Sequence, residues 1–181
     1  MSDHGAAPQV WPEEKEGRGA ATPLVGILCG SASDLQIMQQ ATAILERFGI
    51  PHELRVISAH RNPELVDEYA RTADERGIVA VICGAGMANH LAGAVAARTA
   101  LPVIGVPLSG SKLDGVDALY STVQMPKGVP VATVGVGNGE NAGLLAAAIL
   151  GVSDSGLRQR LADRRAAQAE AIAADPANDG L

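Results

Sequence analysis

The residues best suited to chemistry lie in three short segments, each of which follows an apolar run. One of them, Ser58-Ala59-His60-Arg61, places a hydroxyl, an imidazole and a permanent cation within four positions. Imidazole exchanges protons near neutral pH, and a guanidinium grips phosphate through two parallel hydrogen bonds. His60 is therefore a candidate acid–base group and Arg61 a candidate anion ligand. A surface or packing histidine and a simple Arg61–Glu64 ion pair fit the same residues.

A second segment, Gly30-Ser31-Ala32-Ser33-Asp34, combines a glycine, two hydroxyls and a carboxylate just ahead of a helical pattern. Backbone N–H groups at a helix N-terminus carry partial positive charge and favour phosphate. The loop is thus a candidate phosphate site, and Asp34 a candidate ligand of a ribose hydroxyl. A plain turn with a serine N-cap, and an Asp34 that only complements the helix dipole, explain the loop as well. The P-loop and dinucleotide glycine patterns are both absent.

The third segment, Gly84-Ala85-Gly86, lacks bulky side chains and permits the close approach of a flat ring. It leads to His90, which the pattern places inside the following helix, as a hydrogen-bonded structural residue or as a second catalyst. Cys29 and Cys83 precede two of the segments and are expected to pack as small apolar groups. No CxxC pair, HExxH motif or metal-like spacing occurs in the sequence, so we expect no metal, no disulfide and a reducing compartment, the cytoplasm.

Alternating strand and helix patterns position these segments. Short apolar runs predict five buried strands, at 24–29, 53–57, 78–83, 102–106 and 131–136. Apolar residues at steps of three and four predict helices at 34–48, from 62 to 77, and at 88–98, 115–123, 141–150 and 154–174. The alternation is typical of a parallel, doubly wound α/β sheet.

The topology of such a sheet brings the three segments together. Each follows the carboxyl end of one of the first three strands. In the strand order 2-1-3-4-5 the first and third strands are neighbours, and a topological switch point lies between them. The segments should therefore converge on one pocket.

The composition predicts one domain with two appendages. Apolar residues make up 47 % of the 181 residues but aromatic ones only 2 %, which favours a core of Ala, Val, Leu and Ile between closely packed elements. The net charge of −6 and the scattered basic residues argue against a nucleic-acid surface, and no apolar run approaches the ~20 residues of a membrane helix. We expect a disordered tail over 1–22, a catalytic domain over 23–152, and a C-terminal helix and tail over 153–181 that pack on their own domain or on a neighbouring subunit, or stay exposed.

Together with Tyr120-Ser121-Thr122-Val123-Gln124-Met125-Pro126, the three segments resemble the N5-carboxyaminoimidazole ribonucleotide mutase family of purine biosynthesis. The resemblance runs from about Val25 to Leu150. It implies a flavodoxin-like three-layer αβα sandwich with a parallel five-stranded sheet of order 2-1-3-4-5. It also implies a homo-octamer in which a neighbouring subunit completes each pocket, and a reaction without ATP, metal or redox cofactor.

Carried over position by position, the resemblance makes His60 the proton shuttle. The implied contacts to the phosphorylated aminoimidazole ribonucleotide come from Ser31, Ser33, Asp34, Ser58, Ala59, Arg61, Gly84, Ala85, Gly86 and His90.

The implied reaction moves a carboxylate from an exocyclic nitrogen to a ring carbon. The carbamate releases carbon dioxide, the ring carbon recaptures it, and His60 removes the proton left on that carbon. A closed, dry pocket makes the recapture of the trapped gas effectively unimolecular. The Gly- and Ser-rich loop 108–114 is a candidate lid.

The sequence departs from the family pattern at one loop. The stretch usually written Gly-Gly-Ala-Ala-His-Leu-Pro-Gly is here Gly86-Met87-Ala88-Asn89-His90-Leu91-Ala92-Gly93, so Met87 and Asn89 can reshape the ring pocket. A sister activity carboxylates aminoimidazole ribonucleotide directly with carbon dioxide, and Arg61 and His90-Leu91 favour the mutase over it. A non-catalytic nucleotide-binding module is the other alternative, while the scarcity of aromatic residues disfavours a flavin-binding electron carrier.

Overall fold

A parallel five-stranded sheet forms the centre of this computed structural model, which describes residues 22–178. The strands are β1 Val25–Cys29, β2 His52–Val56, β3 Ala80–Gly86, β4 Val103–Leu108 and β5 Ala132–Thr133. Their order is β2-β1-β3-β4-β5, and every neighbouring pair is parallel. The predicted strand order is confirmed.

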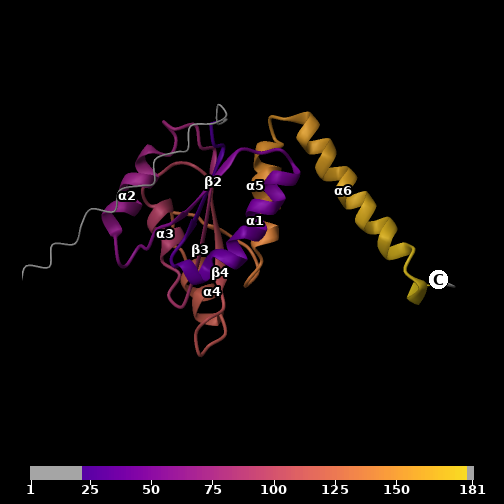
Figure 1. Cartoon of the computed structure of the whole chain (residues 1–181). Coiled ribbons are helices and arrows are strands. Elements are labelled where there is room, and N and C mark those ends of the chain that lie inside the picture. Colours follow the sequence, from indigo (N-terminus) through magenta and orange to yellow (C-terminus); the bar gives the residue numbers. More distant parts are fainter. Residues whose placement is uncertain (1–21, 179–181) are drawn as a thin grey trace, which may run out of the picture.

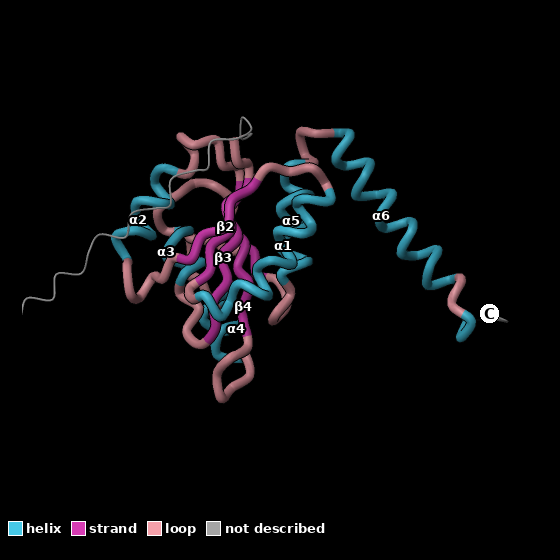
Figure 2. Tube along the Cα trace, viewed as in Figure 1, coloured by secondary structure: helices cyan, strands magenta, loops and turns pink. Residues whose placement is uncertain are grey.

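Helices cover both faces of the sheet and make the three layers that the sequence predicts. The helices are α1 Leu35–Arg47, α2 Pro63–Thr72, α3 Leu91–Ala96, α4 Val116–Val123, α5 Gly139–Leu150 and α6 Ser155–Ala173. One face packs against α1 and α5, and the opposite face against α2 and α3 (Figures 1 and 2). Each face has its own apolar cluster of mostly aliphatic side chains, as the composition predicts.

Several element boundaries differ from the predicted ones for local reasons. Strand β3 runs through Gly84, Ala85 and Gly86, which were expected to form a loop, because these residues continue the ladder with β4 up to Leu108. Strand β5 keeps only two of its six predicted residues. Strand β2 was predicted as a buried strand, yet it is a half-buried edge strand.

The predicted start of α2 is correct, and a side chain caps this helix. Asn62 Oδ1 accepts a hydrogen bond from the backbone N–H of Leu65 at 3.1 Å, and Pro63 takes the first position of α2. By contrast, α3 begins only at Leu91, three residues later than predicted, so His90 precedes the helix rather than lying inside it. A short 3-10 helix, Ala32–Asp34, comes before α1.

Helices α1 and α5 pack closely because small residues line their contact. A Cβ atom at Gly139 would lie 2.3 Å from the carbonyl oxygen of Ile37, and one at Gly143 would lie 2.9 Å from that of Ala41. Only glycine fits at both positions of α5. Figure 1 shows the two helices running side by side on one face of the sheet.

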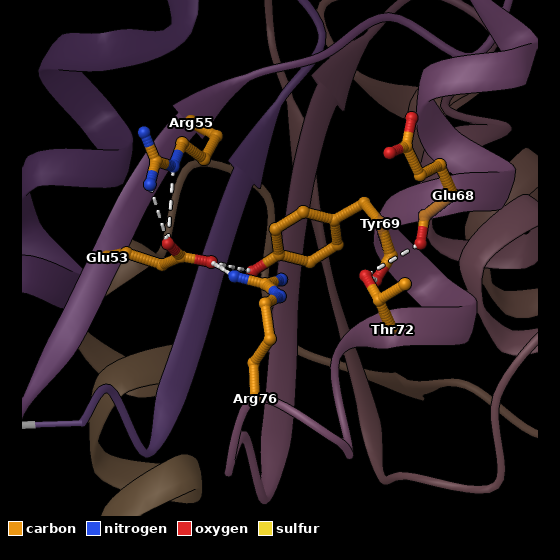
Figure 3. Close-up of polar contacts among 6 residues, drawn as sticks. All are labelled: Glu53, Arg55, Glu68, Tyr69, Thr72 and Arg76. Carbon is orange, nitrogen blue, oxygen red and sulfur yellow. Dashed lines mark hydrogen bonds and ion pairs between the residues drawn. The ribbon is translucent and has the colours of Figure 1, made fainter. Parts of the chain in front are cut away.

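A charged cluster fastens the edge strand β2 to α2 (Figure 3). Glu53 Oε1 accepts hydrogen bonds from Tyr69 Oη at 2.8 Å and from Arg76 Nη1 at 2.7 Å, while its Oε2 accepts two from Arg55. The Arg76 guanidinium also lies 4.6 Å from the centre of the Tyr69 ring, a cation–π distance. Tyr69 reaches across β1 because Gly26 has no side chain there; a Cβ atom would come within 2.1 Å of its hydroxyl.

Helix α6 has buried side chains only in its first two turns, and Arg164 in the next turn still pairs with Glu140 of α5. Leu157 and Leu161 are buried in the cluster formed by α1 and α5, whereas Ile172 near the other end is 68 % exposed. Figure 1 shows the helix running away from the sheet. The tail predicted for residues 1–22 lies, apart from Thr22, outside the described residues. Within 22–178 no helix combines the length and the apolar character needed to cross a membrane.

Candidate active site

The three segments meet at the carboxyl ends of β1, β2 and β3, as the topology predicts. They line a cavity of about 720 Å³, within the size range of small-molecule sites. Nine of the eleven predicted site residues line it: Ser31, Ser33, Asp34, Ser58, Ala59, His60, Arg61, Ala85 and Gly86. Gly84 and His90 do not border this cavity.

Arg61 is held in place by the two neighbouring loops. Its Nε donates to Ser58 Oγ at 3.2 Å, and its Nη2 donates to the carbonyl oxygen of Gly30 at 2.5 Å. The alternative partner, Glu64, forms no ion pair with it among the described side chains. A guanidinium fixed this way presents its charge to the cavity with little further loss of side-chain freedom, which suits an anion ligand.

Asp34 belongs to the cavity rather than to the cap of α1. It makes no side-chain capping bond to that helix, and a Cβ atom at Gly30 would lie 3.7 Å from its Oδ2, which places the carboxylate back over the β1 loop. Burial raises the pKa of Asp34 above its usual range, against the opposing effects of the Ser33 hydroxyl, the Ser31 amide and the Arg61 charge. The Asp34 carboxyl thus lies near the Arg61 charge at the cavity.

The serine loop has its own internal hydrogen bonds. Ser31 Oγ caps the 3-10 helix by accepting from the backbone N–H of Ser33 at 3.4 Å, and it also accepts from Ser33 Oγ at 3.1 Å. This replaces the helix start predicted at Asp34, since the first turn after β1 is the 3-10 helix. Ser33 is exposed and Ser31 half-buried, and both border the cavity.

His60 and His90 form a direct pair. Nε2 of His60 lies 2.8 Å from Nδ1 of His90, and the two rings meet edge to face with their planes at 79°. One nitrogen must donate and the other accept, so the bond admits one proton between the two atoms. His90 therefore contacts the candidate acid–base group itself, although it lies outside the cavity wall.

The glycines of β3 serve different purposes. A Cβ atom at Gly84 would come within 2.2 Å of Met38 Sδ, so this residue faces α1 and allows the helix to pack. Gly86 borders the cavity and lies against the backbone of Leu108 and Ser109. Of the segment expected to face a flat ring, only Ala85 and Gly86 are in the cavity wall.

Sequence reasoning did not assign part of the cavity wall to substrate contact. The additional lining residues are Gly30, Met87, Ala88, Leu91, Ser109 and Gly110. A usable signal exists for the last two, because β4 adjoins β3 and its following loop must open on the same edge. That loop is the start of the proposed lid, in which Ser111 Oγ donates to Asp117 Oδ1 at 2.9 Å.

The motif 120–126 contacts the loop that precedes α3. Ser121 Oγ accepts a hydrogen bond from the backbone N–H of Asn89 at 2.9 Å, and Asn89 Nδ2 donates to the carbonyl oxygen of Val106 at 3.1 Å. Asn89 is fully buried. The family-specific stretch on α4 thus anchors the loop that carries His90.

The cysteines pack as predicted. Both are free and buried, and burial, with a smaller effect of the Asp34 charge, raises the pKa of the Cys29 thiol to about 11. Burial raises the pKa of Cys83 as well. A thiol with a raised pKa is a poor nucleophile at neutral pH. Within residues 22–178 no group of three or more His, Cys, Asp or Glu side chains is arranged to hold a metal ion.

Comparisons with known proteins identify the family of this chain. The AIR carboxylase family profile matches residues 24–171. The chain is 58 % identical over 130 residues to an N5-carboxyaminoimidazole ribonucleotide mutase of Aquifex aeolicus, a match that covers 72 % of this chain and 78 % of that protein. It is 59 % identical over 133 residues to a phosphoribosylaminoimidazole carboxylase of Saccharomyces cerevisiae, covering 74 % of this chain but 23 % of that longer protein.

A solved structure shows the same likeness in three dimensions. The crystal structure of Treponema denticola PurE superimposes with a TM-score of 0.78 at 30 % sequence identity, covering 88 % of this chain and 99 % of that one. With the family profile spanning most of its length, the chain belongs to the AIR carboxylase family.

Proposed function

We propose that the chain is an N5-carboxyaminoimidazole ribonucleotide mutase, which forms 4-carboxy-5-aminoimidazole ribonucleotide in purine biosynthesis. The observation that carries the proposal is the exposed His60–His90 pair, which lies beside a cavity that also holds an immobilised Arg61. Such a cavity offers a cation for a phosphate and an imidazole for a proton. The mutases among the relatives support the choice of reaction.

Different residues of the cavity bind the phosphate, the ribose and the imidazole ring of the substrate. Arg61, Ser31 and Ser33 bind the phosphate, and Asp34 accepts from a ribose hydroxyl. Ala85 and Gly86 leave room for the imidazole ring against the end of β3. Ser58 holds Arg61 through its hydroxyl, which makes its contribution to binding indirect.

His60 moves one proton out and back. The protonated ring donates to the exocyclic nitrogen as the bond between that nitrogen and the carboxyl carbon breaks, which releases carbon dioxide. The ring carbon of the aminoimidazole then attacks carbon dioxide, and the neutral His60 accepts the proton from that carbon. The proton count closes over the cycle, so no external acid, base or redox partner is consumed.

Direct carboxylation of aminoimidazole ribonucleotide is the second candidate, because the longer relatives carry the carboxylase name. The two reactions separate cleanly in one assay. The purified chain is incubated either with N5-carboxyaminoimidazole ribonucleotide in buffer scrubbed of carbon dioxide, or with aminoimidazole ribonucleotide plus bicarbonate, each beside an enzyme-free control. Fast product formation only in the first mixture supports the mutase; fast formation only in the second one refutes it.

We also propose that the active form is a homo-octamer in the cytoplasm. The resemblance to the mutase family supports the octamer, and a groove of about 610 Å³ between α5 and α6 is a candidate surface for the assembly. Its lining mixes apolar and charged side chains, namely Asn138, Glu140, Asn141, Leu144, Leu145, Ala148, Arg164, Arg165 and Gln168. A mass of eight times the 18.4 kDa chain in light scattering is the expected result, and a monomer at working concentration contradicts it. The two free cysteines suit a reducing compartment.

A further inference from the structure

Met87 has a backbone conformation that favours glycine. Its φ angle is +55°, in the left-handed region, and among the described residues only Asp114 shares a positive φ without being glycine. In that region the Cβ atom of an ordinary residue approaches its own backbone, which costs free energy that glycine avoids. The usual family pattern has glycine at this position. Methionine at this position therefore carries a conformational cost that the glycine of the usual pattern avoids.

The Met87 side chain lies at the rim of the active-site cavity. Met87 and Leu91 both border the cavity, and Met87 is 64 % exposed whereas Leu91 is 3 % exposed. Together with Ala88 they add apolar residues to a lining that also contains the serines and Arg61. Met87 follows directly on Gly86, one of the two residues where we expect the aminoimidazole ring.

Carbon dioxide is the component of the reaction that polar groups hold least well. It is neutral and apolar once the bond from nitrogen to carbon has broken, and it must stay near the ring carbon until the new carbon–carbon bond forms. Escape at this stage leaves free aminoimidazole ribonucleotide, with the proton from His60 on its exocyclic nitrogen. An apolar, flexible side chain at the rim slows that escape and excludes water.

We propose that Met87 is a gas-retention residue: its side chain covers the cavity while carbon dioxide lies between the two bonding partners. This inference rests on the proposed mutase function and deepens it. It assigns to one side chain the retention that the two-step transfer requires. The conformational strain at Met87 is the cost of keeping a side chain at that point of the rim.

The test measures how much carbon dioxide exchanges with solvent during turnover. Unlabelled N5-carboxyaminoimidazole ribonucleotide is converted in buffer that contains ¹³C-bicarbonate and carbonic anhydrase, and the ¹³C content of the product carboxylate is read by mass spectrometry. We compare wild type with Met87→Gly, which removes the cover and suits a positive φ, and with Met87→Leu, which restores an apolar side chain of similar size. Val152→Ala, in the turn after α5, controls for loss of an exposed apolar group.

The expected result is little ¹³C in the wild-type product, several-fold more with Met87→Gly, and a return towards the wild-type value with Met87→Leu. Equal labelling of wild type and Met87→Gly overturns the inference, as does complete labelling of the wild-type product. A change in oligomer size that accompanies the leak also overturns it, because Met87 would then act as a contact between copies. If the wild type fails to convert the carbamate at all, the proposed function fails first, which keeps the two failures distinct.

Discussion

Nδ1 of His90 and Nε2 of His60 share one hydrogen bond although thirty positions separate the two residues in the chain. His60 comes from the loop after β2 and His90 from the loop after β3, and β1 lies between these two strands. The pair therefore bridges the edge of the sheet above β1. The contacts that position the loops after β2 and β3 therefore also determine the orientation of the His60 imidazole.

Replacing His60 with asparagine should abolish turnover without unfolding the protein. Asparagine keeps a polar side chain at an exposed site but cannot carry the proton, and general acid–base groups contribute about 10²- to 10⁴-fold to rate. We expect kcat to fall by at least about 100-fold in the mutase assay. Thermal unfolding should match wild type, and normal turnover by His60→Asn would remove His60 from the mechanism.

Replacing His90 with alanine should slow the reaction less than the change at His60. The variant loses one hydrogen bond that orients the imidazole, and a bond of this kind is worth about 1 kcal/mol, or roughly fivefold to tenfold in rate. Because His90 acts through His60, the double variant His60→Asn/His90→Ala should be no slower than His60→Asn alone. Multiplicative losses in this cycle would instead give His90 an independent catalytic role.

Replacing Arg61 with alanine should weaken substrate binding more than it slows the chemical step. Hydrogen bonds to charged groups contribute about 1.5–3 kcal/mol, so KM should rise about 10- to 100-fold. Arg61→Lys keeps the charge but loses the paired contacts to Ser58 and Gly30, and we expect only partial recovery. Arg71→Ala, on an exposed ion pair of α2, is the control and should leave KM unchanged. An unchanged KM in Arg61→Ala would place the phosphate elsewhere.

The Glu53 cluster should make stability depend on pH in the acid range. Burial alone raises the pKa of Glu53, but hydrogen bonds from Arg76, Tyr69 and Arg55 outweigh it and lower the pKa below the ordinary value. The resulting stability is fully present above the unfolded pKa of the carboxyl and is lost as pH falls through the folded one. Denaturant titrations should therefore show the free energy of unfolding decreasing as pH is lowered below about 4.5.

Glu53→Gln should remove most of that dependence and cost about 2 kcal/mol at neutral pH, since it removes the carboxylate charge that pairs with Arg76. Both arginine side chains are about one-third exposed, at 33 % and 36 %, so solvent screening reduces the cost from that of a buried pair. The matched control is Glu46→Gln, on the exposed side of α1. Equal acid sensitivity of wild type and Glu53→Gln would contradict this assignment.

Gly84→Ala should destabilise the fold by about 1–3 kcal/mol, as overpacked cores do, because the added methyl group meets Met38 Sδ. Combining it with Met38→Ala should cost less than the sum of the two single changes, since each relieves the other. The control is Gly135→Ala, where the nearest atom would be 3.7 Å away. Chemical denaturation of the four variants checks the prediction, and additive losses would show that the two side chains do not compete for space.

The sequence predicted the features that follow from local patterns. Apolar runs and glycines located the strands, and the family resemblance implied their order. The positions of Ser31, His60 and Arg61 after those runs placed them at one edge of the sheet. The bond between His60 and His90 was not predictable, since it depends on how two loops close in space. The left-handed backbone of Met87 was hidden because the residue type suggests no such conformation. The role of Glu53 was missed because strand β2 was expected to be buried.

Gly139 and Gly143 let α5 pack closely against α1, which should hold α1 firmly in place. The serine loop continues directly into α1, so its position is fixed by the same packing. We therefore expect the cavity to open at the candidate lid, where Ser109 and Gly110 follow β4. Amide hydrogen exchange should be slow along α1 and α5 and should change on ligand addition mainly over 109–114. In this arrangement the residues that bind the substrate and the loop that opens the cavity belong to separate parts of the chain.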